Sequence, residues 1–193
     1  MVEVLPLSQE GRLRGRLFVV AGPSGAGKTS VVAGLRRLRP LHFSVSATTR
    51  IQRPGEIEGV HYYFVTPGRF DEMIEQGAFL EWAEYNGRKY GTPLAPVQER
   101  LEAGDDVILE IEVQGARQIR QAGLPSLMFF IVPPSLAELE ARLRRRGDTD
   151  EANIARRLRI AAEEIAQAPG LFDHIVVNED LERCISEVDA LME

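Results

Sequence analysis

The sequence predicts an α/β fold in which a parallel sheet is covered by helices on both faces. Four apolar runs, at residues 17–21, 107–111, 127–132 and 174–177, have the length and composition of buried strands. Helical patterns lie between these runs, as expected for strands joined by crossover helices. The first run leads through a glycine-rich turn directly into a helix, which is the connection that opens many such sheets.

The expected helices follow from periodicity and from their ends. One is expected over Lys28–Leu38, after the glycine-rich turn. A second begins near Ser135, with Glu138 three residues later in capping-box spacing, and runs to Arg146 before Gly147. Two more are expected at about 151–168 and at 181–192. These helices account for the covering layers of the sheet.

Residues 43–92 break the strand and helix alternation. They contain short alternating segments around a helix near residues 69–76, and Asn86-Gly87 is a hairpin signal. We therefore expect a small inserted α+β lobe at about 43–92, within a domain over residues 17–193 whose core comprises 17–42 and 93–193. Charged and small polar residues at about 143–158 suggest a mobile lid. Residues 1–16 are expected to form a flexible N-terminal extension.

Composition narrows the function classes. The formal net charge is −6, which argues against nucleic acid as the main partner. Cys184 is the only cysteine, so no intramolecular disulfide can form, and a reducing compartment is expected. No apolar run approaches the ~20 residues of a membrane span, and residues 1–16 lack a secretory signal. We expect a cytoplasmic protein without a membrane partner; the oligomeric state is not predicted.

Residues 22–29 read GPSGAGKT, a complete G-x-x-x-x-G-K-[ST] phosphate-loop pattern between a strand and a helix. Its glycines let backbone N–H groups and the helix N-terminus point at phosphate oxygens. Lys28 would neutralise the β- and γ-phosphates, and the Thr29 hydroxyl would face Mg²⁺. A plain structural turn is the competing interpretation. ATPases, GTPases and many kinases share the motif, so it does not identify the acceptor.

Further segments resemble the guanylate kinase family, and the resemblance runs from about Leu17 to the C-terminal helix. It rests on the segments GPSGAGKTS, FSVSATTRIQRPGE, GVHYYF, FLEWAEYNGRKYGT and ILEIEVQGA, together with the arginines near the expected lid. The resemblance implies a P-loop NTPase-type fold with a lobe that binds a nucleoside monophosphate and with a helical lid. It also implies transfer of a phosphoryl group from ATP to GMP, and to dGMP, in purine nucleotide metabolism. The residues implied to bind ATP are Gly22, Pro23, Ser24, Gly25, Ala26, Gly27, Lys28, Thr29 and Ser30.

The resemblance assigns the acceptor nucleotide to the lobe. Arg50 and Arg53, with their forked donors, suit a phosphate dianion, although on their own they could be solvated surface residues. Glu81 is implied to face the guanine N1–H and N2 amine, and Ser46 and Thr92 are implied to supply the hydroxyls that face O6. The residues implied to bind GMP are Ser46, Arg50, Arg53, Tyr62, Glu81, Tyr90, Thr92 and Glu112.

Glu110 and Glu112 are expected to end the strand that starts at Val107, with both side chains on one face. An acid at this place assists Mg²⁺ in P-loop enzymes, often through water. Guanylate kinases commonly carry aspartates at both positions, so the division between metal and substrate contacts stays open. Arg142, Arg146 and Arg157 match lid arginines of the family and are expected to be catalytic with Lys28. A solvated charged helix face is the alternative for these arginines.

The sequence also bears on three other function classes. A guanylate-kinase-like interaction module is expected to lose the phosphate loop or the acceptor arginines, but this chain keeps both. A kinase for a sugar phosphate would not need Glu81, Ser46 and Thr92. A GTPase switch would need a guanine motif such as N-K-x-D, which is absent from the sequence. Because both phosphate sites must meet, the sequence predicts domain closure with both substrates bound.

Overall fold

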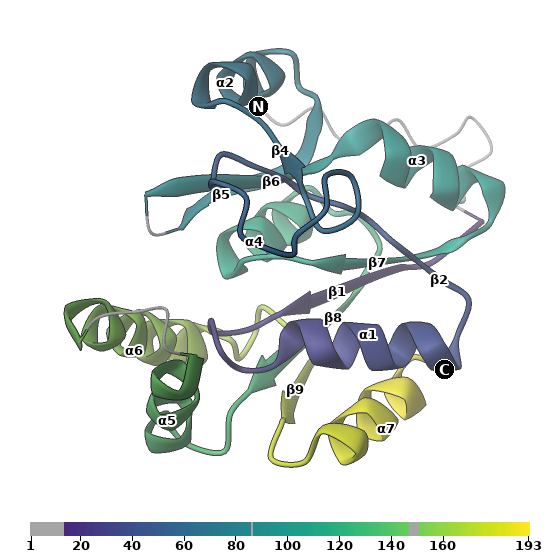
Figure 1. The fold of residues 1–193 in the computed structure, drawn as a ribbon. Helices are drawn as coiled ribbons and strands as arrows, with labels where there is room; N and C mark the ends of the chain where they lie inside the picture. Colours follow the sequence, from purple (N-terminus) through teal and green to yellow (C-terminus); the bar gives the residue numbers. More distant parts are fainter. Residues whose placement is uncertain (1–13, 86, 147–150) are drawn as a thin grey trace. The chain divides into compact units, whose positions relative to one another are not determined.

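The computed structural model describes residues 14–85, 87–146 and 151–193, with only the backbone of residue 146. These residues form the predicted α/β fold (Figure 1). The strands are β1 (Leu17–Ala21), β2 (Leu41–Phe43), β3 (Ala47–Thr48), β4 (Tyr63–Phe64), β5 (Phe79–Tyr85), β6 (Arg88–Pro93), β7 (Asp106–Glu110), β8 (Leu127–Val132) and β9 (His174–Val177). The helices are α1 (Lys28–Leu38), α2 (Pro67–Glu75), α3 (Leu94–Ala103), α4 (Val113–Gln121), α5 (Leu136–Arg146), α6 (Glu151–Gln167) and α7 (Leu181–Leu191).

The larger sheet has the strand order β2-β7-β1-β8-β9. The pairs β2–β7 and β8–β9 are parallel, as the fold class requires. Every residue of β1 is buried, which explains its uninterrupted apolar sequence. The predicted bounds of β1, β8, β9 and α1 are those of the structure.

The chain divides into two compact units, neither of which is a continuous segment. Unit 1 comprises the residues up to 18 together with 41–126, and unit 2 comprises 19–40 together with 127–193. The predicted division into core, lobe and lid stays a prediction, and residues 1–13 and 147–150 lie outside the described part. Within that part, no helix is both long and apolar enough to cross a membrane.

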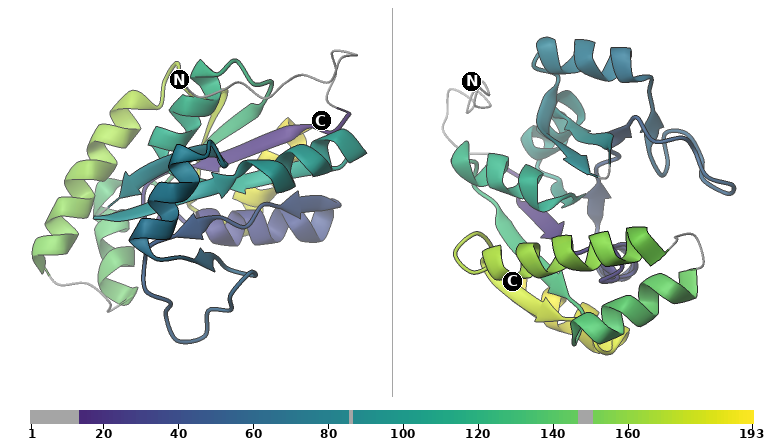
Figure 2. Two further views of the ribbon diagram at one scale, coloured as in Figure 1. Left: turned by 90° about the horizontal axis from the view of Figure 1, so that it is seen from above. Right: turned by 90° about the vertical axis from the view of Figure 1, so that its left-hand side faces the viewer.

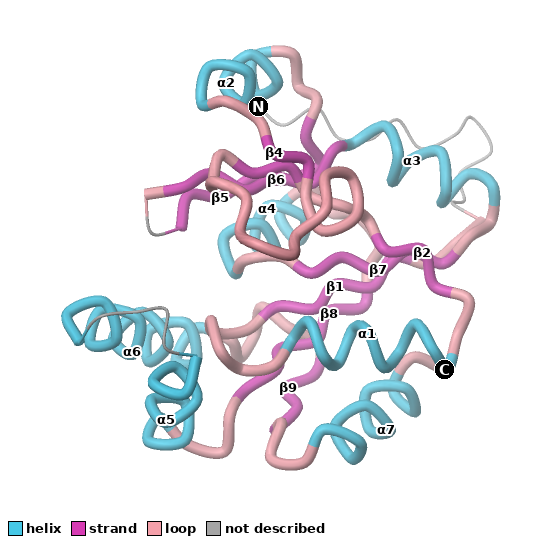
Figure 3. Tube along the Cα trace, in the orientation of Figure 1, coloured by secondary structure: helices cyan, strands magenta, loops and turns pink. Residues whose placement is uncertain are grey.

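Unit 1 contains a second, four-stranded sheet with the order β4-β3-β6-β5. Strands β5 and β6 form the predicted antiparallel hairpin, with Tyr85 opposite Arg88; Asn86 itself lies outside the described residues. A long loop joins β3 to β4 (Figure 3). Helix α2 starts where Thr66 Oγ1 accepts from Arg69 N, and its Phe70 packs against Phe79. The expected short strands around one helix are therefore present.

In unit 2, α1 lies along α7, and α5 lies beside α6 (Figure 2). The second pair is held by a cluster of buried residues: Leu139, Leu143, Ile154 and Ala161. Ser135 Oγ accepts from Glu138 N at 3.1 Å, so the predicted N-cap of α5 is confirmed.

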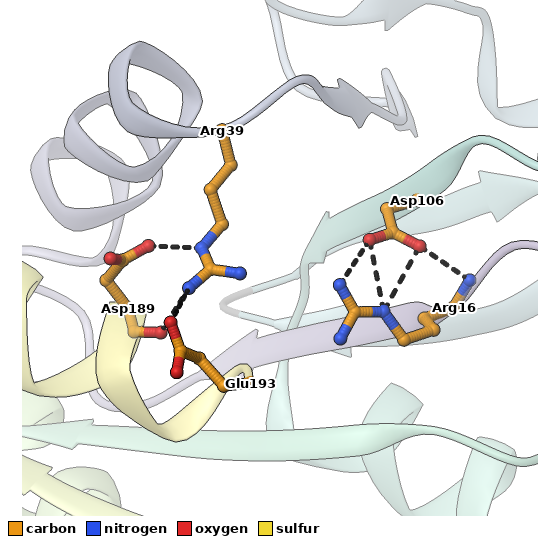
Figure 4. A network of polar contacts seen from close by, with 5 residues as sticks. All are labelled: Arg16, Arg39, Asp106, Asp189 and Glu193. Carbon is orange, nitrogen blue, oxygen red and sulfur yellow. Dashed lines mark hydrogen bonds and ion pairs between the residues drawn. The ribbon is translucent and has the colours of Figure 1, made fainter.

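Two groups of ion pairs each belong to one unit (Figure 4). In unit 1, Arg16 donates from its backbone N and from Nη2 to Asp106, at 2.9 and 2.7 Å, which ties the start of β1 to the start of β7. In unit 2, Arg39 at the end of α1 pairs with Asp189 and Glu193 at the end of the chain. Such partly exposed pairs fix local geometry more than they add stability.

Candidate active site

The phosphate loop in unit 2 joins buried β1 to α1, as its sequence predicts. A side chain cannot be added without a clash at two of its glycines: a Cβ on Gly22, where φ is 147°, would lie 2.1 Å from the backbone oxygen of Ile131. One on Gly27, where φ is 96°, would lie 2.3 Å from Asn178 Nδ2. These glycines therefore serve both the left-handed backbone and the close packing of the loop.

Lys28 is folded back over this loop. Its Nζ donates to the backbone oxygens of Gly22 at 2.6 Å and of Pro23 at 3.3 Å. The N-cap of α1 is Gly27, which has no side chain to accept from the first turn, and no acidic residue lies in that turn. Helix α1 thus directs N–H groups and the positive end of its dipole at the loop, with Thr29 and Ser30 exposed in the first turn.

Asn178 holds the phosphate loop by a hydrogen bond, and the sequence analysis missed this residue. It follows β9 directly, is 5% exposed, and donates from Nδ2 to Ala26 O at 2.8 Å. Arg142 joins the same cluster, because its Nη2 donates to Asn178 O at 2.8 Å and its Nη1 to Ala26 O at 3.4 Å. A polar residue directly after the predicted strand 174–177 was the only signal in the sequence.

Replacing Asn178 with alanine is expected to lower the free energy of unfolding by about 1 to 3 kcal/mol, since it removes a buried hydrogen-bond donor. The Ala26 carbonyl would keep only the longer bond from Arg142. Urea denaturation measures the loss, and steady-state kinetics should show the KM for the loop's nucleotide rising while the acceptor KM holds. An unchanged unfolding midpoint would contradict this role.

The remaining lid candidates have different surroundings. Arg157 lies on α6 with its Nε buried, and among described groups this atom has no hydrogen-bond partner. Arg144 and Arg145 pair with glutamates of α5 and α6, as a solvated charged face would. The side chain of Arg146 lies outside the described residues. The structure therefore brings Arg142 to the phosphate loop, and the roles of Arg146 and Arg157 stay predictions.

In unit 1, the candidate phosphate-binding side chains converge around Arg50. Its Nη1 and Nη2 donate to the two carboxylate oxygens of Glu56, at 3.0 and 2.6 Å. Its guanidinium lies 5.3 Å from the ring centroid of Tyr62, and the rings of Tyr62 and Tyr90 meet edge to face at 6.1 Å. Burial raises the pKa of both tyrosines, so both hydroxyls keep their protons and can donate to an anion.

Glu56 is the second residue that sequence reasoning missed. Besides gripping Arg50, it accepts from the backbone N of Arg53 at 2.8 Å, while the Arg53 side chain is exposed. The hydrogen bond from Arg50 lowers the pKa of Glu56. Two arginines three residues apart are thus organised by one carboxylate, which fixes the orientation of the Arg50 fork.

Glu81 on β5 is a buried carboxyl group, 3% exposed. Its Oε1 accepts from Thr92 N at 3.1 Å and from Thr92 Oγ1 at 2.6 Å. Burial raises the pKa of Glu81 to about 7, with the Thr92 hydrogen bonds acting in the opposite direction and the Glu112 charge adding to the rise. The Thr92 hydroxyl proton is therefore engaged by Glu81, whereas the sequence analysis placed this hydroxyl against the base.

The acidic pair is arranged differently from the prediction. Strand β7 ends at Glu110, and Glu112 is the N-cap of α4, where its backbone oxygen accepts from Ala116 N at 3.1 Å. The prediction that both glutamates end the strand is wrong for Glu112, because that residue already makes the first bond of the helix. Ser46 is half-buried, and its backbone oxygen accepts from Tyr63 N.

In the described ranges, no cluster of three or more His, Cys, Asp or Glu side chains is placed to hold a metal ion. Thr29 offers one hydroxyl, exposed in the first turn of α1. A cation there would take most of its ligands from phosphates and water, as Mg²⁺ commonly does.

The chain is similar to known proteins both in sequence and in fold. A sequence profile of the guanylate kinase family matches residues 14–193. The guanylate kinase of Synechococcus sp. (strain JA-3-3Ab) is 51% identical over 180 residues, which cover 93% of this chain and 82% of the relative. That of Nostoc sp. (strain PCC 7120 / SAG 25.82 / UTEX 2576) is 46% identical over 198 positions, which cover 100% of this chain and 99% of the relative.

Solved structures agree. The guanylate kinase of Anaplasma phagocytophilum matches with a TM-score of 0.75 at 31% identity, over 94% of this chain and 86% of the other. A gluconokinase of Sinorhizobium meliloti 1021 shares the fold, with a TM-score of 0.50 at 19% identity, over 93% of this chain and 91% of the other. Because the profile and relatives near 50% identity both extend along almost the whole sequence, the chain belongs to the guanylate kinase family.

Proposed function

We propose that the protein transfers the γ-phosphoryl group of ATP to GMP, and to dGMP, and so forms ADP and GDP or dGDP in cytoplasmic purine nucleotide metabolism. The observation that carries the proposal is the buried Glu81 carboxylate on the sheet that also bears Tyr90. Glu81 on β5 lies opposite Thr92 on β6. Tyr90 is two residues before Thr92, so both side chains point to the same face of β6. A base-reading acid and a phosphate-binding hydroxyl thus share one surface.

Guanine is selected by its pattern of donors. Its N1–H and N2 amine face an acceptor, whereas adenine presents an acceptor at N1 and would leave a buried carboxylate unpaired. That mismatch costs about 1 to 3 kcal/mol or more for a charged group. Glu81 supplies the acceptor, Thr92 orients it, and Ser46 and Glu112 complete the base contacts. Arg50, Arg53, Tyr62 and Tyr90 bind the acceptor phosphate.

The donor ATP occupies the loop of residues 22–30. Backbone N–H groups and the N-terminus of α1 bind the phosphates, and Lys28 neutralises their charge. Thr29 would hold Mg²⁺, with Glu110 or Glu112 assisting through water. When bound, this ion neutralises charge on the β- and γ-phosphates.

Transfer needs positioning and cations more than covalent chemistry. An oxygen of the acceptor phosphate attacks Pγ in line while the bond from Pγ to the β-phosphate oxygen breaks. The acceptor phosphate is already ionised near neutral pH, so no general base is required. Arg142, Arg146 and Arg157 stabilise the charge that spreads over the moving group, together with Lys28.

The test is a coupled ADP-release assay with ATP, Mg²⁺ and each of GMP, dGMP, AMP, CMP and UMP. We expect kcat/KM for GMP to exceed that for AMP by about a hundredfold or more, because the adenine ring leaves Glu81 unpaired. Equal activity on AMP and GMP would overturn the base assignment. Absence of ADP release with every acceptor would favour a binding module over an enzyme.

A further inference from the structure

Strand β5 is at the edge of the four-stranded sheet, so one side of its backbone lies outside the ladder. At Trp82 that side is filled by the side-chain amide of Gln118 from α4. Trp82 N donates to Gln118 Oε1 at 3.2 Å, and Gln118 Nε2 donates to Trp82 O at 2.5 Å. A side-chain amide carries the same donor and acceptor as a peptide group, so Gln118 acts as one more residue of sheet. Trp82 directly follows Glu81.

Gly115 contacts Glu81 from the same helix. It lies three residues before Gln118, which puts both on one face of α4. A Cβ on Gly115 would lie 1.9 Å from Glu81 Oε2 and 2.6 Å from Glu81 Cδ. The backbone of Gly115 is helical and is not among the positive-φ glycines, so its conformation would accept alanine. Glycine is required here by the approach of the carboxylate alone.

We propose that α4 positions the base-reading carboxylate. Gly115 leaves the space that Glu81 Oε2 occupies, and Gln118 fixes the strand at the next residue. Since Oε1 already accepts twice from Thr92, Oε2 is the oxygen with capacity left for the guanine donors. The inference rests on the proposed function, because it gives Glu81 the guanine ring. It makes Gly115 and Gln118 positioning residues for base selection.

The first test is Gly115→Ala. Alanine is the better helix former, so α4 should fold normally. The added methyl group must displace Glu81 Oε2, and buried Glu81 has little room to move. We expect the KM for GMP to rise about tenfold or more, the preference for GMP over AMP in kcat/KM to fall by a similar factor, and the KM for ATP to stay within about twofold. A structural role alone would lower the melting temperature without changing the preference.

A double-mutant cycle tests the contact itself. Glu81→Asp shortens the side chain by one methylene and so withdraws the carboxylate from the space that the alanine methyl group would take. Adding Gly115→Ala to Glu81→Asp is then expected to cost less than about twofold in the GMP preference, against tenfold in the wild-type background. If the two changes lower the preference independently, the contact has no part in selection and the proposal fails.

The second test is Gln118→Leu, with Gln121→Leu as the matched control on an exposed position of the same helix. Gln118→Leu removes both bonds to the Trp82 backbone and is expected to raise the KM for GMP about fivefold or more. The chain has a single tryptophan, so Trp82 fluorescence reports this site directly. Its emission should change in Gln118→Leu and not in Gln121→Leu.

The outcomes separate the two hypotheses. If the wild type prefers GMP and neither Gly115→Ala nor Gln118→Leu changes that preference, the positioning role is wrong and the proposed function stands. If the wild type phosphorylates no nucleoside monophosphate, or shows no preference for GMP, the proposed function is wrong and the inference fails with it.

Discussion

Replacing Lys28 with methionine is expected to lower kcat by about a hundredfold to a thousandfold, with the fold intact. The ammonium group lies over the phosphate loop, held by the oxygens of Gly22 and Pro23. Charge that develops on the transferring group needs a fixed cation there, and removal of one such donor commonly costs about 10²- to 10³-fold. Methionine keeps the length and apolar stem of lysine, so the loss isolates the charge.

The chain supplies its own control for this experiment, because it has only one other lysine. Lys89 pairs with Asp71 on the surface of unit 1. Lys89→Met should change kcat by less than about twofold, since an exposed ion pair contributes little. Coupled ADP-release assays measure kcat of both variants, and thermal melts show whether both are folded. A Lys28→Met enzyme that keeps a tenth of wild-type turnover would remove this residue from the catalytic set.

Glu81→Gln should produce the other large effect, a fall of about a hundredfold or more in kcat/KM for GMP. The amide would turn a donor toward the guanine donors or lose one of the two contacts from Thr92. Discrimination against AMP should weaken at the same time, because the buried charge that we propose to reject adenine is gone. Kinetics with both acceptors measure the change. A variant as selective as the wild type would exclude Glu81 from base recognition.

For Glu81→Gln we also expect the free energy of unfolding to depend on pH differently from that of the wild type. The pKa of Glu81 is raised from its ordinary value of 4.5 to about 7, so between these values the folded state binds the proton more tightly than the unfolded state. The stabilisation from this proton is complete below about pH 4.5 and is lost as pH rises through 7; its limit is about 3 kcal/mol. Glu81→Gln should therefore gain stability relative to wild type between pH 5 and pH 8 in urea denaturation.

The activity on GMP should depend on the ionised form of Glu81. If the guanine donors bind the Glu81 carboxylate as proposed, wild-type kcat/KM for GMP should rise through about pH 7 more steeply than ionisation of the acceptor phosphate alone requires. Glu81→Gln keeps the phosphate titration and removes the carboxyl titration, which makes it the matched control. Superimposable pH profiles for the two proteins would show that the carboxyl group does not titrate in this range.

The elements that the sequence predicted well are those with strong local signals. Strand β1 is buried throughout, and α1 starts at the lysine of a motif that itself requires a helix, so their bounds could be read directly. Strands β2 and β4 have three and two residues, too few for any periodic pattern. The end of β7 was misplaced because Glu112 has extended backbone angles although it belongs to the start of α4.

In the candidate site, too, the residues with a strong local signal were predicted and the others were not. The phosphate loop is a continuous motif, and its residues could be named from the sequence alone. Asn178 could not, because its bond to Ala26 joins positions 152 residues apart. The bond from Thr92 to Glu81 likewise depends on the register of the β5–β6 hairpin, which directs the hydroxyl to the carboxylate and not to the base that the sequence analysis expected. Contacts between distant side chains are set by tertiary packing, and no local pattern encodes them.

The discontinuity of unit 2 has a consequence for biosynthesis. Its first part, residues 19–40, carries the phosphate loop and α1 and leaves the ribosome well before α7 does. A Cβ on Gly34 of α1 would lie 2.2 Å from Ile185 of α7, so these two helices are in intimate contact in the finished protein. The face of α1 that packs against α7 therefore stays uncovered until α7 has been translated. Ribosome-bound chains that stop before residue 181 should therefore bind holdase chaperones more strongly than chains that include α7.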